Sequence, residues 1–131
     1  MTIHIAYVDN NQLHQFTFEQ VVKVLKAGGI DNTLQIYDTQ LTAINHLPYE
    51  RPDIVFVNLR MRNGQHTAGL DIVRVLRTHP LCQTIVITGM ADYAMPADHA
   101  AALAAGCHNF MPLPVRFPEV ENIMLSLCAS G

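Results

Sequence analysis

The sequence predicts an α/β fold in which a parallel sheet is covered by helices on both faces. Five short apolar runs alternate along the chain with five segments of helical periodicity. The run at residues 54–59 is apolar except for Asn58 and shows no polar–apolar alternation, which is typical of a strand buried on both faces. Because right-handed crossovers join such strands, we expect a three-layer sandwich of helices, sheet and helices.

The expected strands are short apolar runs bounded by polar residues, glycines or prolines. They are residues 3–8, 33–37, 54–59, 83–88 and 108–111. The third of them lies within the stretch 52–61, around which the rest of the sheet is expected to form.

The first expected helix covers residues 12–26. The polar cluster at residues 9–11 can cap its free backbone N–H groups, and Gly28-Gly29 ends it. Five apolar side chains form the stripe that should face the sheet: Leu13, Phe16, Val21, Val22 and Leu25.

The remaining helices follow the same signals. A short helix after Asp38-Thr39 should turn Leu41, Ile44 and Leu47 inward and end at Pro48. Further helices are expected at residues 70–78, at residues 96–104 and from residue 117 nearly to the last residue.

Length and composition indicate one domain, residues 1–131, that folds around a hydrophobic core. Half of the residues are hydrophobic, and the formal net charge of -3 gives no general attraction to nucleic acid or to an anionic membrane. The three cysteines have neither zinc-ligand spacing nor a disulfide pattern. Without a signal peptide or an apolar run of roughly 18 residues, the chain is expected to be soluble and cytoplasmic.

Polar side chains stand where several of the expected strands end. Asp9 and Asn10 follow the first strand, Asn58 ends the third and Thr88 ends the fourth, while residues 112–114 follow the fifth. Because sites in doubly wound sheets form at the carboxyl ends of the strands, these residues should line one crevice.

Six segments, taken in order and spacing, resemble the receiver domain of two-component response regulators over nearly the whole chain. They are Val8-Asp9-Asn10, residues 52–61, Gly69-Leu70-Asp71, residues 85–89, Ala104-Ala105-Gly106 and residues 110–115. The resemblance implies a flavodoxin-like (βα)5 sandwich whose parallel strands have the order 2-1-3-4-5.

The resemblance also implies roles for the crevice residues. Receivers accept a phosphoryl group on an aspartate, and the matching residue here is Asn58. The other matches are Asp9, Asn10 and the Arg60 carbonyl for magnesium, Thr88 for the phosphate-contacting hydroxyl, Leu113 for a lysine, and Phe110 for an aromatic residue that reports the state of the switch.

Three of these positions depart from the family pattern, at Asn58, Asn10 and Leu113. An asparagine amide nitrogen is not a nucleophile, so the acceptor chemistry is missing. Magnesium prefers carboxylate oxygens, and with Asp9 as the one matched acid its binding should be weak or absent. No other cofactor is expected.

Three further interpretations of the crevice remain open. Thr88 can hydrogen-bond Asn58 in a structural clasp, and Phe110 can be a permanently packed ring. Arg60, Arg62 and His66 can form an anion site, since guanidinium groups recognise phosphate and carboxylate well.

These observations predict a receiver-like signalling module that is not phosphorylated and acts by protein–protein contact. The partner would be a histidine kinase, an output domain or another signalling protein. A homodimer could form through the helix at residues 96–104, the strand at residues 108–111 and the final helix. The alternatives are a sensor of a small anionic ligand, or the regulatory domain of a larger output protein.

Enzymatic activity and nucleic-acid binding by this domain are not expected. No Ser/His/Asp or Cys/His pairing is indicated, and the glycine-flanked loop at residues 64–69 lacks the lysine of a phosphate-binding P-loop. The chain also has no recognition helix or basic stripe, and no direct membrane contact is expected.

Overall fold

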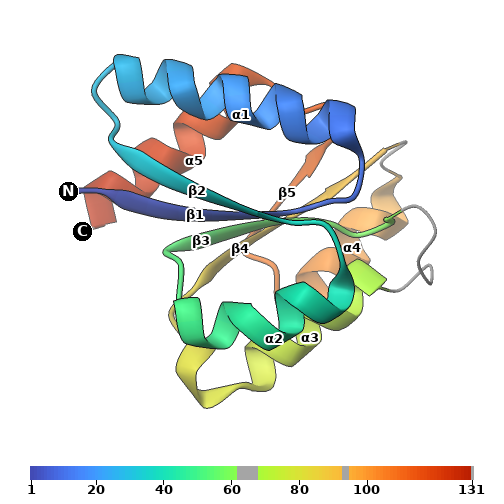
Figure 1. Cartoon of the computed structure of the whole chain (residues 1–131). Helices are drawn as coiled ribbons and strands as arrows, with labels where there is room; N and C mark the ends of the chain where they lie inside the picture. Colours follow the sequence, from blue (N-terminus) through green and yellow to red (C-terminus); the bar gives the residue numbers. More distant parts are fainter. Residues whose placement is uncertain (62–67, 93–94, 131) are drawn as a thin grey trace.

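The computed structural model describes residues 1–61, 68–92 and 95–130, and it confirms the predicted fold class (Figure 1). All strand pairs are parallel, and the order in the five-stranded sheet is β2-β1-β3-β4-β5. The strands are β1 (Ile3–Val8), β2 (Asn32–Tyr37), β3 (Ile54–Asn58), β4 (Val86–Ala91) and β5 (Asn109–Pro112).

The helices form two layers around this sheet. They are α1 (Gln12–Ala27), α2 (Gln40–Glu50), α3 (Ala68–Thr78), α4 (Pro96–Ala105) and α5 (Phe117–Ser130), with a short 3₁₀ helix at Pro80–Cys82. Helices α1 and α5 cover one face of the sheet, and α2, α3 and α4 cover the other (Figure 1). Within the described residues, no helix is long and hydrophobic enough to span a bilayer.

Each face of the sheet has its own hydrophobic core. On the α1–α5 side the rings of Tyr7 and Phe56 flank Phe18, with ring centroids 4.4 Å and 4.8 Å away from it. On the other side Leu47 of α2 and Leu76 of α3 pack against the opposite face of the strands. Every residue of β3 is buried, as the uninterrupted apolar run predicts.

The predicted inward stripes of α1 and α2 are partly wrong. Leu13, Phe16 and Leu41 have exposed fractions of 70%, 58% and 70%. Helix α1 instead turns Phe18 toward the sheet, together with the correctly predicted Val21, Val22 and Leu25. Because α1 carries apolar residues on both sides, its hydrophobic pattern does not define one buried face.

Several element boundaries also differ from the prediction by one to three residues, and those of α2 and β4 are the most informative. Pro48 lies inside α2, which continues to Glu50 before Arg51 adopts a left-handed conformation (φ 47°). Strand β4 begins and ends three residues later than the predicted 83–88, because the apolar Met90 and Ala91 continue it beyond Thr88-Gly89. The shift of β4 alters the expected site.

Candidate functional site

The candidate site lies at the carboxyl end of the sheet, where β1, β3 and β4 are neighbours. Asp9 follows β1, Asn58 is the last residue of β3, and Met90 pairs with Asn58 in the register of β4. The asparagine is 4% exposed, and the other two side chains are completely buried. The site is therefore closed to solvent and lies at the edge where open α/β sheets form their ligand sites.

Asp9 accepts hydrogen bonds from four groups of the chain. One carboxylate oxygen, Oδ1, accepts from the backbone N–H of Asn11 (3.1 Å) and from the side-chain amide of Asn58 (3.2 Å). The other, Oδ2, accepts from the Tyr7 hydroxyl (3.3 Å) and from Nδ1 of His14 (2.9 Å). A carboxylate has about four acceptor positions, so internal donors occupy all of them.

Tyr7 stays a donor in this cluster because its phenol does not ionise at physiological pH. Burial raises the pKa of Tyr7, and the negative charge of Asp9 raises it further.

His14 could not be identified as a site residue from the sequence, since its contact with Asp9 depends on the path of the chain from β1 into α1. The only local signal was its position five residues after an acid that follows a strand.

Asn58 is oriented by both ends of its amide group. Its nitrogen donates to Asp9, and its oxygen accepts the backbone N–H of Arg60 at 2.9 Å. An aspartate here would bring a second carboxylate within about hydrogen-bonding distance of Asp9, and the two negative charges would repel each other. An asparagine at position 58 avoids this repulsion and donates a hydrogen bond to Asp9 instead.

The predicted clasp between Thr88 and Asn58 is wrong. Thr88 pairs with Phe56, two residues before Asn58 in β3, and its hydroxyl oxygen accepts from the Asn109 side chain at 3.5 Å. Because β4 continues to Ala91, the side chain level with Asn58 is that of Met90, a residue that the sequence reasoning missed. The sequence did contain a signal for this longer strand, because the two residues after Gly89, Met90 and Ala91, are apolar and can extend it.

Leu113 contributes a hydrocarbon side chain where the resemblance implies a lysine. It is 8% exposed, belongs to the core beneath α1 and α5, and precedes Pro114 through a cis peptide bond. Its backbone N–H donates to Ala91 at 3.0 Å. The described part of this site therefore contains no lysine to balance a phosphoryl group.

Arg60 does not point into the pocket as a free anion-binding group. Its guanidinium forms an ion pair with Asp98, a buried residue in the first turn of α4. Asp98 also accepts the backbone N–H of Met95 at 2.9 Å and so caps α4. The contact ties the end of β3 to α4, while Arg62 and His66 lie outside the described residues.

Two predicted positions remain, Asn10 and Phe110. Asn10 is half-buried next to Asp9. Phe110 is half-buried in β5 and stacks on His99 of α4, with a ring-centroid separation of 5.4 Å. Its ring therefore has a packing partner on the face formed by α4 and β5.

The residues at this site do not fit a magnesium ion. Hydrogen bonds occupy both oxygens of Asp9, and the matched positions Asn10 and Asn58 carry amides rather than carboxylates. Across residues 1–61, 68–92 and 95–130, no three His, Cys, Asp or Glu side chains gather in a metal-binding group.

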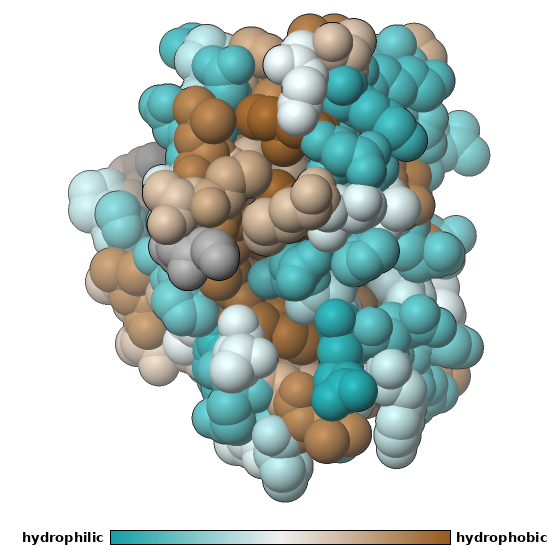
Figure 2. Space-filling view, turned by 90° about the vertical axis from the view of Figure 1, so that its left-hand side faces the viewer, coloured by the Kyte–Doolittle hydropathy of each residue, from teal (hydrophilic) through white to brown (hydrophobic). Residues whose placement is uncertain are grey.

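A hollow of about 680 Å³ lies at the opposite, amino end of the sheet. Met1, Tyr49, Arg51 and Leu81 are among its lining residues. Figure 2 faces this end of the molecule, where hydrophobic and hydrophilic side chains are interspersed. It shares no lining residue with the Asp9–Asn58 cluster.

Comparison with solved structures identifies the architecture. A response regulator from Chloroflexus aurantiacus J-10-fl superposes with a TM-score of 0.83 at 17% identity, covering 98% of this chain and 99% of that one. A signal receiver domain of a DNA-binding response regulator from Colwellia psychrerythraea 34H gives 0.84 at 17% identity over 97% and 98% of the two chains. The chain has the receiver fold.

The receiver domain of a sensor histidine kinase from Pseudomonas aeruginosa PAO1 gives a TM-score of 0.81 at 17% identity, covering 98% of this chain and 99% of that one. That domain was solved with magnesium coordinated in its active-site cleft. No protein-family model and no curated protein sequence matches the chain. At this level of identity the likeness establishes the receiver fold, and the function must be argued from the site.

Proposed function

We propose that the chain is a cytoplasmic receiver-like module of a two-component or phosphorelay pathway, which acts by protein contact without being phosphorylated. One observation carries this proposal. The acceptor position holds Asn58, whose amide nitrogen donates to Asp9 while its oxygen is bound to the backbone of Arg60. Both ends of the amide are used in the structure, and neither is a nucleophile toward phosphorus.

The rest of the pocket supports the same proposal. Phosphoryl transfer depends on cations that neutralise the developing negative charge. Here Asp9 is saturated by internal donors, Leu113 is apolar, and Met90 stands level with Asn58. The pocket therefore lacks the acceptor carboxylate. Its described residues also supply no group that would balance the negative charge of a phosphoryl group.

The face formed by α4, β5 and α5 is our candidate surface for a histidine kinase, an output domain or another signalling protein. The Arg60–Asp98 ion pair and the Phe110–His99 stack hold α4 against β3 and β5. Leu103 of α4 and Leu125 of α5 are each 48% exposed. A surface held in one arrangement would bind its partner constitutively.

The ligand-sensor alternative has less support. It needs Arg60, Arg62 and Thr88 as anion contacts. The side chains of Arg60 and Thr88 are engaged with Asp98 and Asn109, and Arg62 lies outside the described residues. A role as the regulatory domain of a larger output protein is compatible with the same surface.

Incubation with Mg²⁺ and a small acyl phosphate is expected to leave the intact mass of the chain unchanged, because Asn58 cannot form an acyl phosphate. Mass spectrometry of the whole protein measures this, with a receiver that retains its acceptor aspartate treated in parallel. Stoichiometric addition of one phosphoryl group to this chain would contradict the proposal.

A further inference from the structure

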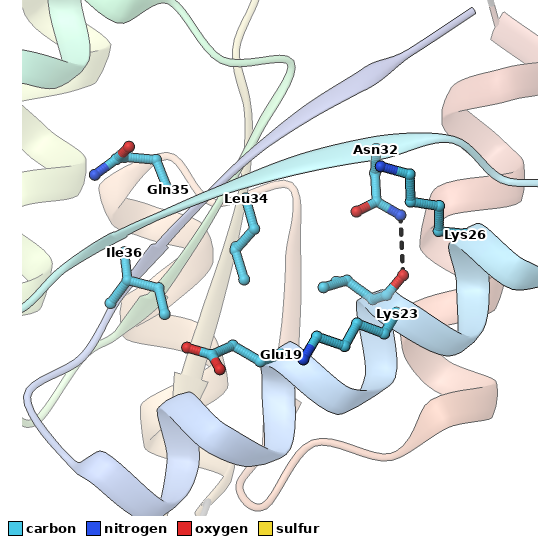
Figure 3. Close-up of a pocket in the computed structure, with 8 residues that line it drawn as sticks. Glu19, Lys23, Lys26, Asn32, Leu34, Gln35 and Ile36 are labelled. Atoms are coloured by element: carbon cyan, nitrogen blue, oxygen red, sulfur yellow. Dashed lines mark hydrogen bonds between the residues drawn. The ribbon is translucent and has the colours of Figure 1, made fainter.

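A groove of about 440 Å³ opens between α1 and the edge strand β2 (Figure 3). Leu34 and Ile36 point from β2 toward α1, while Glu19 and Lys23 line the α1 side (Figure 3). Val22 completes its apolar lining. Since β2 is the edge of the sheet, nothing in the described chain covers the open side of this groove.

The same helix carries an exposed aromatic side chain close to the groove. Phe16 is 58% exposed and precedes Glu19 by three residues, which is less than one helical turn. It lies on the side of α1 opposite the buried Val21 and Leu25. A single chain thus presents both a large apolar protrusion and an apolar groove.

We propose that two copies of the chain associate about a two-fold axis through the α1–β2 face, each placing Phe16 at the groove of the other. In an isologous contact both copies use the same patch, so the protruding ring of each copy can be buried in the groove of the other. A partner must offer both a groove for Phe16 and a protrusion for the groove, and a second copy of the chain offers both.

The charges along α1 support an antiparallel pairing of the two helices. Glu19 and Lys23 form no ion pair within the described residues and lie four residues apart on the groove side. If Glu19 of one copy faces Lys23 of the other, the pair repeats by symmetry. In an antiparallel pairing, residues equally far before and after the central position face each other. Position 21 is central for Glu19 and Lys23, and it is also central for Phe16 and Lys26.

The pairing of Phe16 with Lys26 about the same central position gives each exposed ring a cationic neighbour. In this register Phe16 lies opposite Lys26 of the other copy, an arrangement that allows a cation–π contact. Lys26 already pairs with Asp31 at 3.8 Å, so its charge is held at the end of the groove. The interface is small, and we expect a dissociation constant on the order of 100 µM.

Sedimentation velocity of the full chain, from about 10 µM to about 1 mM, is expected to show a reversible monomer–dimer equilibrium. The Phe16→Asp variant should remain monomeric over this range. Leu41→Asp is the matched control, because Leu41 is also a large exposed side chain but lies on α2. Its equilibrium should equal that of the unchanged chain.

Charge reversal tests the antiparallel register itself. Glu19→Lys and Lys23→Glu should each weaken dimerisation about tenfold, since each places like charges together twice. The double reversal should restore affinity to within about threefold of the original. Circular-dichroism melts check that every variant is folded.

Three results would overturn the inference: a chain that is monomeric at the highest concentration, a dimer that survives Phe16→Asp, or a double reversal that fails to restore affinity. Loss of the dimer on Leu125→Asp, with Phe16→Asp without effect, would place the contact on the face of α4, β5 and α5 instead.

Discussion

Replacing Gly69 by alanine should lower the free energy of unfolding by about 3 kcal/mol or more. Gly69 lies in the first turn of α3, directly against the end of β3. A Cβ atom there would lie 2.3 Å from the Asn58 carbonyl oxygen and 2.4 Å from the Leu59 Cα. Both neighbours are backbone atoms of a buried segment, so α3 and β3 would have to separate.

Urea unfolding of the two proteins measures this difference. Gly28→Ala is the matched control, because a Cβ there would be 3.5 Å from its nearest neighbour and φ is an ordinary -84°. The control should change stability by no more than about 0.5 kcal/mol. Equal stability of Gly69→Ala and the unchanged chain would show that α3 does not approach β3 this closely.

Replacing Asp9 by alanine should also lower the free energy of unfolding by about 3 kcal/mol. The substitution leaves the Tyr7 hydroxyl, the His14 ring, the Asn58 amide and the Asn11 N–H without their common acceptor. Buried donors that lose their acceptor cost more than the bond itself contributed.

The sign of this effect distinguishes two kinds of pocket. Where several carboxylates crowd together, removing one relieves repulsion and can stabilise the fold. Here Asp9 accepts hydrogen bonds from four donors, and the nearby carboxylate of Asp92 is half-exposed and lies 3.9 Å from Nε2 of His14. The loss of the common acceptor therefore outweighs any relief of repulsion, and removing Asp9 should destabilise the fold. Glu50→Ala is the control, since that side chain is exposed, lies at the opposite end of the sheet and should contribute about 0.5 kcal/mol or less. A stabilised Asp9→Ala protein would contradict this description of the site.

The central strand and the order of elements were predictable because their causes are local. The run Ile54–Asn58 has no polar residue before its end, and only a strand covered on both faces suits such a run. Proline and glycine signals likewise placed the start of α4 at Pro96 and its end before Gly106.

The contacts within the site were less predictable because they depend on register between strands. The register of β4 against β3 pairs Asn58 with Met90 and Thr88 with Phe56, and β4 reaches Met90 because it continues to Ala91. A sequence does not state how far a strand continues past a Thr-Gly pair when apolar residues follow. The bond between His14 and Asp9 similarly depends on the path from β1 into α1.

The outward orientation of Leu13 and Phe16 has another cause. Apolar residues occur on both sides of α1, and only the packing of Phe18 between Tyr7 and Phe56 selects the buried side. Phe16, one of the apolar residues left outside, is the protrusion from which we infer self-association. A large apolar side chain that was expected in the core but lies on the surface, such as Phe16, thus indicates a candidate contact surface.

A ¹H–¹⁵N correlation spectrum of the labelled chain, recorded before and after addition of Mg²⁺ and beryllofluoride, tests most directly whether the pocket takes a divalent ion or a phosphoryl analogue. We predict that the amides of Asn58, Met90 and Leu113 keep their chemical shifts, because Asp9 is saturated and Asn58 offers no carboxylate. Saturable shifts at these amides and along α4 and β5 would contradict a phosphorylation-independent receiver.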